Sequence, residues 1–526
     1  MNNHNLINFT RDILNTPFIR YKEFILLYAS IQEWCREWIT IYPLKELLKG
    51  LQYEIIGDFQ HVSINRCIDH SKQIREGDVF VSQTKNRLFI DEAIRNGAIA
   101  ILSECFIPDC MVPQIIIPTD MHHFNSRLSI LTYELYGSKI KTIGITGTNG
   151  KTTVASFVGQ LLMQQNKSVC VIGTLGVFEN GKKLVNYLRS NTTLPFYDFI
   201  QVVRHCYESN VGYIVLEASS QGLLDQRLSN YPIDVGVFLN IGKDHIEFHG
   251  GMVPYKKSKE LLVSLSNHLV INDDDAWCKS IAEKTYLPVT RFGENHKNDI
   301  IYQKVDYSKE KIKYKFLVGK KALHIEMTNS GYYNGANLAA AIAVMKSLGI
   351  SIEELKPVKL PKGRLERIDN ERGIEVLIDY AHTPDALDAS LGAIRTYAKN
   401  DVYVVFGCGG NRDRQKRKSM GEVATKYATK AIITNDNPRY ENPADIIADI
   451  IQGTKKDKII IEMDRKQAIL LALSIAKRGD IVLIAGKGHE QEQIVNDLVV
   501  PFSDHEVVQN YFEELDGSIT KNDPVA

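Results

Sequence analysis

The sequence lacks several features that would assign it to a particular class at once. Its eight cysteines include no C-x-x-C pair, so neither a zinc site nor a dithiol redox motif is indicated. Its 63 basic and 63 acidic residues cancel, so no overall field attracts nucleic acid or an anionic membrane. It has no signal-peptide pattern and no apolar run long enough to cross a bilayer. We therefore expect a soluble cytoplasmic protein with reduced thiols and with neither nucleic acid nor membrane as a partner.

The length of 526 residues allows about three or four domains, and no internal repeat divides the chain. Residues 1–42 carry aromatic and apolar side chains too densely for a disordered tail, and we expect one or two helices of unassigned function there. Strands and helices then alternate, which predicts α/β domains at 43–140, 141–360 and 361–526. The regular alternation predicts parallel sheets in the second and third domains, with ligands at the carboxyl ends of the strands.

The stretch 142–153 combines a β-prone run, a glycine-bounded turn and the start of a helix. Gly147 and Gly150 allow backbone N–H groups to face an anion, and the helix N-terminus adds its positive end. Lys151 can neutralise outer phosphates, and a threonine hydroxyl after it can hold Mg²⁺. The standard P-loop has glycine at the position of Ile145, so an ordinary tight turn is the alternative interpretation. We favour a nucleotide site.

Two further strands end in residues that suit a magnesium-bound nucleotide. Glu217 closes the strand 213–217, while Asp244 and His245 follow the strand 235–239. Strand ends of an α/β sheet lie on the side of the phosphate loop, where carboxylate and imidazole groups can serve as metal ligands. Taken singly, Asp244 would be a helix cap and His245 a surface histidine. Together with the phosphate loop, they favour a metal site.

Nine short motifs resemble those of the Mur ligase family in order and spacing, and they cover nearly everything after about residue 43. They are GTNGKTT (147–153), EASS (217–220), NIGKDH (240–245), YNGAN (333–337), GRLER (363–367), DYAHTPDA (379–386), GGNRD (409–413), DNPR (436–439) and GKGHE (486–490). Within the family they are most similar to the branch that adds the third residue of the peptidoglycan stem peptide.

The resemblance implies a three-domain ATP-dependent, ADP-forming acid–amino-acid ligase. ATP would convert a carboxylate to an acyl phosphate, which the incoming amine attacks with release of phosphate. The implied substrates are the UDP-sugar-peptide UDP-N-acetylmuramoyl-L-alanyl-D-glutamate and the diamino acid meso-diaminopimelate, joined in peptidoglycan precursor synthesis. The three domains would be a small α/β domain that binds the acceptor, a P-loop domain with a parallel sheet that binds ATP, and a Rossmann-like α/β domain that binds the amino acid. We also expect two Mg²⁺ ions and a monomer.

The resemblance also assigns the nucleotide and metal sites. The nucleotide contacts it implies are Gly147, Thr148, Asn149, Gly150, Lys151, Thr152, Thr153, Asn337, Arg364, Asp379, Tyr380 and His382. The implied metal ligands are Thr152, Glu217, His245 and Lys259, and the implied catalytic residues are Lys151, Glu217, His245 and Lys259. Lys259 matches a carbamylated lysine of the family, and a carbamate offers the anionic oxygen that Mg²⁺ prefers. From the residues alone, Lys259 is a solvated helix charge.

The implied amine pocket lies in the third domain. It comprises Arg412, Asp436, Asn437, Pro438, Arg439, Gly486 and Glu490. DNPR is the variant that the family associates with meso-diaminopimelate rather than lysine, since a guanidinium fork can bind the second carboxylate of that amino acid. The alternative is a proline-stiffened turn with a solvated arginine.

The acceptor contacts are only partly retained. The implied contacts in the second domain are Asn191, Thr192, Thr193, Ser219 and Arg227. In the first domain His70 replaces a uridine-contacting serine of the family, and the loop between Phe80 and Phe89 is shorter. A Mur-like ligase of another pathway, with a non-UDP acceptor, is therefore the alternative. A nucleotide-binding switch is a further alternative, which the joint presence of Glu217, His245 and Lys259 disfavours.

Overall fold

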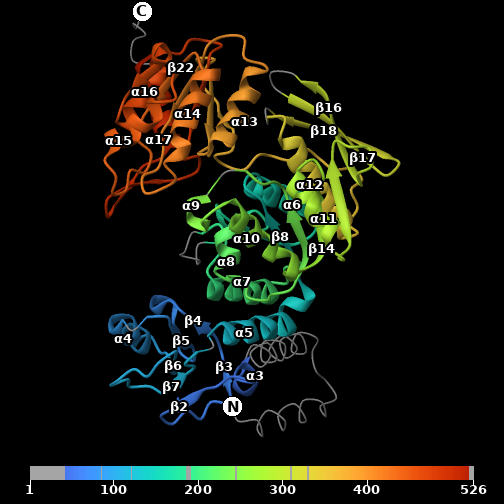
Figure 1. Cartoon of the computed structure of the whole chain (residues 1–526), viewed down its shortest axis with the longest axis vertical. Helices are drawn as coiled ribbons and strands as arrows, with labels where there is room; N and C mark the ends of the chain where they lie inside the picture. Colours follow the sequence, from blue (N-terminus) through green and yellow to red (C-terminus); the bar gives the residue numbers. More distant parts are fainter. Residues whose placement is uncertain are drawn as a thin grey trace, which may run out of the picture. The chain divides into compact units, whose positions relative to one another are not determined.

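The computed structural model describes residues 42–519 apart from residues 85, 120, 185–190, 243, 245, 308–310 and 329–330. The helices expected before residue 42 lie outside the described residues. The chain divides into two compact units (Figure 1). The smaller holds the chain up to Ser138 with 200–204 and 229–231, and the larger holds the rest. No helix in the described part of the chain has the length and apolarity needed to span a membrane.

The smaller unit is built on a five-stranded sheet in the order β2-β7-β6-β5-β4. Its strands are β2 (Glu54–Ile56), β4 (Cys67–Ile68), β5 (Val79–Ser82), β6 (Ala100–Ser103) and β7 (Gln114–Ile116). Strands β4 to β7 are parallel, and β2 runs antiparallel to β7. Helix α4 (Arg87–Arg95) buries Ile90 and Ala93 against the sheet. The remaining elements are β1 (Tyr42–Pro43), α3 (Leu44–Leu47), β3 (Ser63–Ile64) and α5 (Met121–Leu135). This is the small α/β fold predicted for the stretch.

The larger unit contains an eleven-stranded sheet in the order β11-β10-β9-β12-β8-β13-β14-β15-β16-β17-β18. Its strands are β8 (Lys141–Thr146), β9 (Val169–Gly173), β10 (Gly176–Glu179), β11 (Lys182–Lys183), β12 (Tyr213–Glu217), β13 (Ile233–Phe238), β14 (Ser266–Asn272), β15 (Val289–Gly293), β16 (Ile300–Tyr307), β17 (Lys311–Val318) and β18 (Lys321–Thr328). The parallel sheet predicted here is confirmed for its centre, from β9 to β16.

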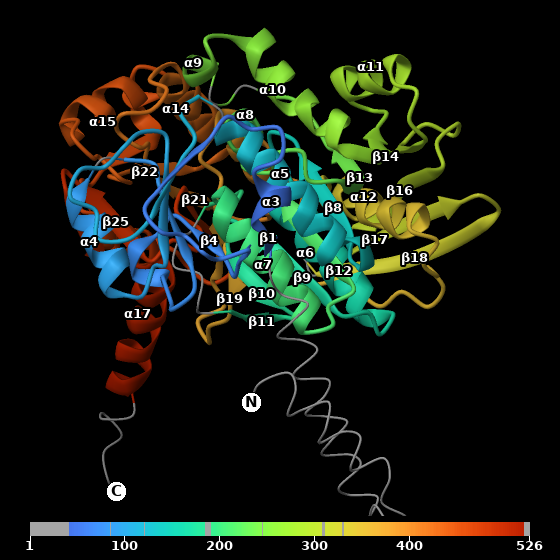
Figure 2. The same ribbon diagram turned by 90° about the horizontal axis from the view of Figure 1, so that it is seen from below.

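Both edges of this sheet are antiparallel, which sequence analysis did not predict. Strands β10 and β11 at one edge, and β17 and β18 at the other, pair antiparallel (yellow edge in Figure 2). The segment Lys311–Phe316 alternates exposed or partly exposed lysines with buried apolar residues. This period of two is typical of an antiparallel strand with one solvated face, rather than of a strand buried on both faces.

Helices cover the central sheet. They are α6 (Lys151–Gln164), α7 (Phe196–Glu208), α8 (Ser220–Leu224), α9 (Ile246–His249), α10 (Met252–Leu265), α11 (Ala276–Lys284) and α12 (Asn334–Ser347). Helix α12 lies against α6 (Figure 1), and its residues 338–345 are fully buried. This apolar, alanine-rich stretch is suited to its place because small side chains allow close packing on both sides.

A six-stranded sheet follows in the order β19-β20-β24-β21-β22-β23. Its strands are β19 (Glu366–Ile368), β20 (Glu375–Asp379), β21 (Val402–Phe406), β22 (Lys430–Ile433), β23 (Ile459–Ile461) and β24 (Ile481–Ala485). All pair parallel except β19. One face packs against α13 (Pro384–Arg395), α14 (Gln415–Tyr427) and α15 (Pro443–Ile451), and the other against α16 (Arg465–Ile475) and α17 (Asp504–Ile519). A hairpin, β25 (Glu492–Val495) and β26 (Leu498–Pro501), follows β24. The predicted Rossmann-like fold is confirmed.

The linker between the two sheets is fastened to helix α6. The side chain of Gln160 accepts from the backbone nitrogen of Lys359 and donates to its carbonyl, both at 2.8 Å. Gln164 binds Lys356 in the same way, at 2.9 and 3.1 Å. We call these four hydrogen bonds the linker clasp. They join the linker to the helix that begins at the phosphate loop.

Candidate active site

The phosphate loop joins β8 to α6 through two glycines with positive φ. Gly147 has φ +156° and Gly150 has φ +91°. A Cβ on Gly150 would lie 2.6 Å from Oδ1 of Asn337, and one on Gly147 would lie 2.9 Å from the Cβ of Leu239. Both positions therefore require glycine, because neither the backbone conformation nor the space accepts a side chain. The strand–loop–helix predicted from the sequence is present.

Lys151 begins helix α6 and folds back over the loop. Its ammonium donates to the carbonyls of Gly147 and Thr148, both at 2.9 Å. Burial lowers the pKa of Lys151, and the nearby charges of Glu217 and Asp244 oppose that shift. The cation thus lies at the loop, where outer phosphates would bind.

Glu217 lies at the end of β12 and is 2% exposed. Its carboxylate accepts hydrogen bonds from the Thr152 hydroxyl at 2.9 Å and from the Thr174 backbone nitrogen at 2.8 Å. Burial raises the pKa of Glu217, while the Lys151 charge opposes this. The Thr152–Glu217 pair offers oxygen donors, the ligand type that Mg²⁺ prefers, so these two residues fit the ion. In the described part of the chain, no cluster of three or more His, Cys, Asp or Glu side chains is arranged as a metal site.

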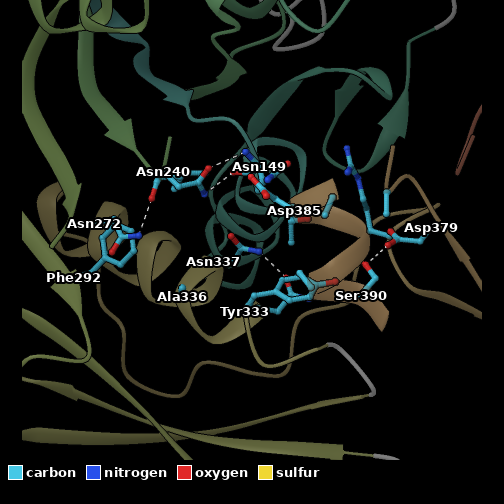
Figure 3. Close-up of a pocket in the computed structure, with 18 residues that line it drawn as sticks. Asn149, Asn240, Asn272, Phe292, Tyr333, Ala336, Asn337, Asp379, Asp385 and Ser390 are labelled. Atoms are coloured by element: carbon cyan, nitrogen blue, oxygen red, sulfur yellow. Dashed lines mark hydrogen bonds between the residues drawn. The ribbon is translucent and has the colours of Figure 1, made fainter. Parts of the chain in front are cut away.

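The loop after β13 contributes Asn240 and Asp244. The Asn240 side chain accepts from the backbone nitrogen of Asn149 at 2.9 Å and donates to its carbonyl at 3.0 Å, as Figure 3 shows. Asp244 is buried. Its negative charge opposes the lowering of the pKa values of Lys151, Lys259 and His382. The predicted ligand His245 lies outside the described residues and stays a prediction.

Lys259 on helix α10 is buried, with 1% of its surface exposed. Interpreting it as a solvated helix charge was therefore wrong. Its amine donates to the Gly147 carbonyl at 3.0 Å and lies 4.6 Å from the ring centre of Tyr255. The Tyr255 hydroxyl in turn bonds the Thr148 hydroxyl at 3.0 Å. Burial holds the pKa of Lys259 well below its ordinary value, and the charge of Lys151 lowers it further. The neutral amine that carbamylation requires is thus favoured.

A cavity of about 250 Å³ lies between the phosphate loop, the start of α12 and the end of β20 (Figure 3). Three of the predicted base and ribose contacts, Asn337, Arg364 and Asp379, line it. Asp379 also accepts hydrogen bonds from Ser390 and from the backbone of Tyr380, so part of its carboxylate is used to cap its own loop.

Arg364, Tyr380 and His382 border a second, larger cavity. The Arg364 guanidinium donates to the Thr152 hydroxyl at 3.2 Å and lies 4.7 Å from the Tyr380 ring centre. Nδ1 of His382 lies 2.8 Å from the Tyr380 carbonyl and must donate to it. Burial lowers the pKa of His382 to about 4, and the charge of Lys416 contributes. This imidazole is neutral at physiological pH.

The predicted amine pocket forms at the carboxyl ends of β21, β22 and β24. Arg439, with φ +51°, donates to the Gly410 carbonyl at 2.9 Å. Burial lowers the pKa of Arg439, and the charge of Arg412 adds to this. The Asn437 amide donates to the Glu490 carboxylate at 3.1 Å. Gly486 has φ +113°, and a Cβ there would lie 2.8 Å from a carboxylate oxygen of Asp436, so the backbone conformation favours glycine.

The larger cavity, of about 740 Å³, unites most of the predicted residues within the larger unit. Those that line it are Thr148, Asn149, Gly150, Lys151, Thr152, Asn191, Thr192, Glu217, Ser219, Arg227, Arg364, Tyr380, His382, Arg412, Asp436, Asn437, Arg439, Gly486 and Glu490. Thr193 lies behind its wall, where its hydroxyl bonds the Glu217 carbonyl at 2.8 Å and the Ser219 hydroxyl at 2.9 Å. Residues predicted to bind the nucleotide, the acceptor and the amine thus line one cavity.

Comparison with known proteins agrees with this arrangement. Residues 145–345 match the model of the Mur ligase middle domain, and residues 363–488 match that of the Mur ligase, glutamate ligase domain. The chain is 38% identical, over 486 residues, to UDP-N-acetylmuramoyl-L-alanyl-D-glutamate--2,6-diaminopimelate ligase of Chlamydia pneumoniae, covering 88% of this chain and 98% of the relative. The protein of the same name from Caldanaerobacter subterraneus subsp. tengcongensis is 35% identical over 482 residues, covering 90% and 99%.

The chain belongs to the Mur ligase family. The resemblance carried by the nine sequence motifs is thereby confirmed, as is the three-domain α/β architecture. A solved structure of a Mur ligase, a UDP-N-acetylmuramoyl-L-alanyl-D-glutamate--2,6-diaminopimelate ligase, superposes with a TM-score of 0.61 at 27% identity. The superposition covers 90% of this chain and 99% of that one.

Sequence analysis missed several residues of this Mur ligase site. Asn272 and Phe292, at the ends of β14 and β15, line the smaller cavity. The rule that ligands bind at the carboxyl ends of parallel strands could have found both. Lys487 is fully buried and donates to Glu490 at 2.9 Å. Lys416 lines the larger cavity. In the sequence it is one of several basic residues of the segment 412–418, and no signal distinguishes it from the others.

Proposed function

We propose that this Mur ligase joins meso-diaminopimelate to UDP-N-acetylmuramoyl-L-alanyl-D-glutamate in peptidoglycan precursor synthesis, converting ATP to ADP and phosphate. The observation that carries the proposal is the composition of the amine pocket. Arg412 and Arg439 supply two guanidinium groups, and Asp436 and Glu490 supply two carboxylates, around one cavity. Meso-diaminopimelate carries two carboxylates and two ammonium groups, so charges of both signs are matched.

The reaction divides into two bond exchanges. A carboxylate oxygen of the acceptor bonds to the terminal phosphorus while the bond to the bridging oxygen of ADP breaks. The amine nitrogen then bonds to the acyl carbon while the carbon–oxygen bond to phosphate breaks. Of the two protons that the ammonium loses, one appears on inorganic phosphate and one goes to solvent. Since the phosphoryl group carries most of the charge, the protein's work is positioning and charge neutralisation.

The residues of the phosphate loop have distinct tasks in this proposal. Lys151 exchanges the Gly147 and Thr148 carbonyls for outer phosphates. Thr152 and Glu217 hold one Mg²⁺, and His245 with a carbamate on Lys259 holds a second. Bound Mg²⁺ supplies charge neutralisation at the transferred group. Two observations support this assignment. The Thr152 hydroxyl and the Glu217 carboxylate place oxygen ligands side by side, and burial lowers the pKa of the Lys259 amine.

The alternative, a Mur-like ligase with a non-UDP acceptor, rests on His70 in the smaller unit. Nδ1 of His70 is buried and has no hydrogen-bond partner among the described residues. The uridine-contacting serine of the family is absent at this position. We favour the UDP-bearing acceptor because Asn191, Thr192 and Ser219 line the cavity. That the enzyme acts as a cytoplasmic monomer remains part of the proposal.

The test measures phosphate release with acceptors that carry or lack the UDP group. We expect removal of UDP to lower kcat/KM by a factor that corresponds to several kcal/mol of transition-state stabilisation, because remote binding energy positions the reacting carboxylate. Equal kcat/KM for the two acceptors would favour the alternative.

The same assay compares meso-diaminopimelate with lysine. We expect a preference of about 10⁴ for meso-diaminopimelate, because lysine leaves an arginine unpaired. Arg439→Ala should reduce that preference, while Arg414→Ala should leave it unchanged, since Arg414 is exposed and pairs with Asp449. Equal kcat/KM for the two amines in the wild type would refute the assignment of the amine.

A further inference from the structure

The segment that begins helix α14 is strongly basic, and its cations have two different environments. Arg414 and Arg417 both bind the carboxylate of Asp449, at 3.1 and 3.0 Å. Arg417 is fully buried and also binds Glu441 at 2.9 Å. These two arginines therefore tie α14 to α15.

Lys416 differs from these neighbours. It lines the larger cavity, and within the described residues it makes no ion pair. Its neighbour Lys418 lies 4.0 Å from Glu422 with 60% of its side chain exposed, and it does not line the cavity. A cation kept without a carboxylate partner, in a cavity beside other charged groups, is suited to an anionic ligand.

The charge of Lys416 acts towards the nucleotide side of the cavity. It contributes to the lowered pKa of His382, a residue of the loop after β20. Asp244, next to Lys151 and Lys259, acts on the same imidazole. The charge of Arg412, by contrast, contributes to the lowered pKa of Arg439 in the amine pocket. Lys416 thus lies where the nucleotide residues and the amine pocket meet.

We propose that Lys416 is a catalytic residue that binds the phosphoryl group during its transfer to the acceptor carboxylate and its departure as inorganic phosphate. The proposal rests on the proposed function for the identity of the reaction. The phosphoryl group begins bonded to ADP, on the side of Lys151, and ends free beside the amine pocket. Lys416, on helix α14, lines the same cavity as Lys151 and neutralises charge along that path. The lysine keeps its proton in both steps.

Lysine suits this task better than arginine. Its ammonium is a compact point charge on a flexible stem, so it can follow a phosphorus whose bonding partners change. The guanidinium fork of Arg412 or Arg439 instead matches a carboxylate that stays fixed.

The first test compares Lys416→Met with the matched control Lys418→Met. We expect kcat to fall about 100-fold in Lys416→Met, as for removal of one group that stabilises transition-state charge, with little change in the KM of the amine. Lys416→Arg should restore part of kcat, and Lys418→Met should match the wild type. A loss of less than about tenfold overturns the proposal, and so does a change confined to the KM of the amine.

The second test does not depend on turnover, so failure of the proposed function leaves it intact. Inorganic phosphate is titrated calorimetrically into the protein saturated with ADP and Mg²⁺. We expect Lys416→Met to weaken phosphate binding at least about tenfold, and Lys418→Met to leave it unchanged. Equal phosphate affinity in the wild type and Lys416→Met, or no measurable phosphate binding in the wild type, overturns the proposal. A wild type that binds phosphate but does not ligate meso-diaminopimelate contradicts the proposed function alone.

Discussion

At the scale of single residues, Lys259 is the side chain whose surroundings matter most. A lysine ammonium is rarely buried because removing it from water is costly. Here the amine has one backbone carbonyl acceptor and one aromatic ring beside it, and Lys151 repels its charge. The lowered pKa therefore favours a nucleophilic, neutral amine, the form that reacts with carbon dioxide.

We predict that the active enzyme carries a carbamate on Lys259. Lys259→Ala should lose most turnover, because a metal ligand is removed, and added short carboxylates should restore part of it. Lys257→Ala, an exposed lysine on the same helix, is the control and should remain active. Turnover and intact mass under native conditions give the measurement. Fully active enzyme in which only the free amine is found would contradict the prediction.

The resemblance to the Mur ligase family could identify most of the predicted residues that line the cavity, because the order and spacing of the motifs preserve which strand end carries which side chain. It could not predict the burial of Lys259, whose neighbours Lys256 and Lys257 give the helix a solvated appearance. That burial depends on contact with Gly147, more than a hundred residues away. Lys416 was missed for a related reason. Several cations are adjacent in this segment, and the sequence does not show which of them form ion pairs. In the structure Arg414 and Arg417 pair with Asp449, and Arg417 also pairs with Glu441.

At the scale of elements, the loop after the linker is held by close backbone contact. Gly363 has φ +67°, and a Cβ there would overlap the backbone nitrogen of His489 and lie 2.6 Å from the carbonyl carbon of Gly488. Gly349, which follows α12, has the same φ of +67°, with nothing within 4 Å of such a Cβ. The two glycines share a backbone conformation and differ only in their surroundings.

We predict that Gly349→Ala costs about 1–2 kcal/mol of stability, the price of a left-handed conformation for a residue with a Cβ. Gly363→Ala should cost more and should also displace the loop 486–490, lowering kcat/KM for the amine more than about tenfold. Chemical denaturation and steady-state kinetics on both variants provide the measurement. Equal effects of the two substitutions would show that the contact with Gly488 and His489 is unimportant.

The elements themselves were predicted unevenly. Strand β12 has its predicted bounds, 213–217, because it is a short, mostly apolar run buried in the middle of the sheet. The antiparallel strands β17 and β18 were missed because charged residues interrupt their apolar pattern. The existence of a buried strand follows from its local apolar pattern. The pairing of edge strands depends on tertiary contacts that periodicity does not encode.

At the scale of the whole larger unit, the linker clasp joins nucleotide site and third sheet. Gln160 and Gln164 lie on α6, whose first residue is Lys151. We predict that Gln160→Leu/Gln164→Leu lowers kcat while ATP affinity changes little, because the phosphate loop is retained but the domain that carries Lys416 is less firmly held to α6. Each lost hydrogen bond contributes about 0.5–1.5 kcal/mol.

The control for this pair is Gln165→Leu, since Gln165 makes no side-chain hydrogen bond with the described residues. Nucleotide binding is measured by calorimetry and kcat by phosphate release. A parallel loss of ATP affinity and kcat would show that the substitutions damage α6 itself rather than the linker.

The linker clasp also determines where rotation can occur. Because Lys356 and Lys359 are fixed to α6 and Gly363 is packed against Gly488, torsional freedom is confined to residues 360–362, one of which is a proline with restricted φ. Any rotation of the six-stranded sheet against the central sheet would therefore turn about these residues, which shortly precede β19 in the chain. Strand β22 is four positions across the sheet from β19, about 19 Å at ordinary strand spacing. A 10° swing would displace Arg439, after β22, by roughly 3 Å, whereas Arg364, which adjoins the linker, would move far less.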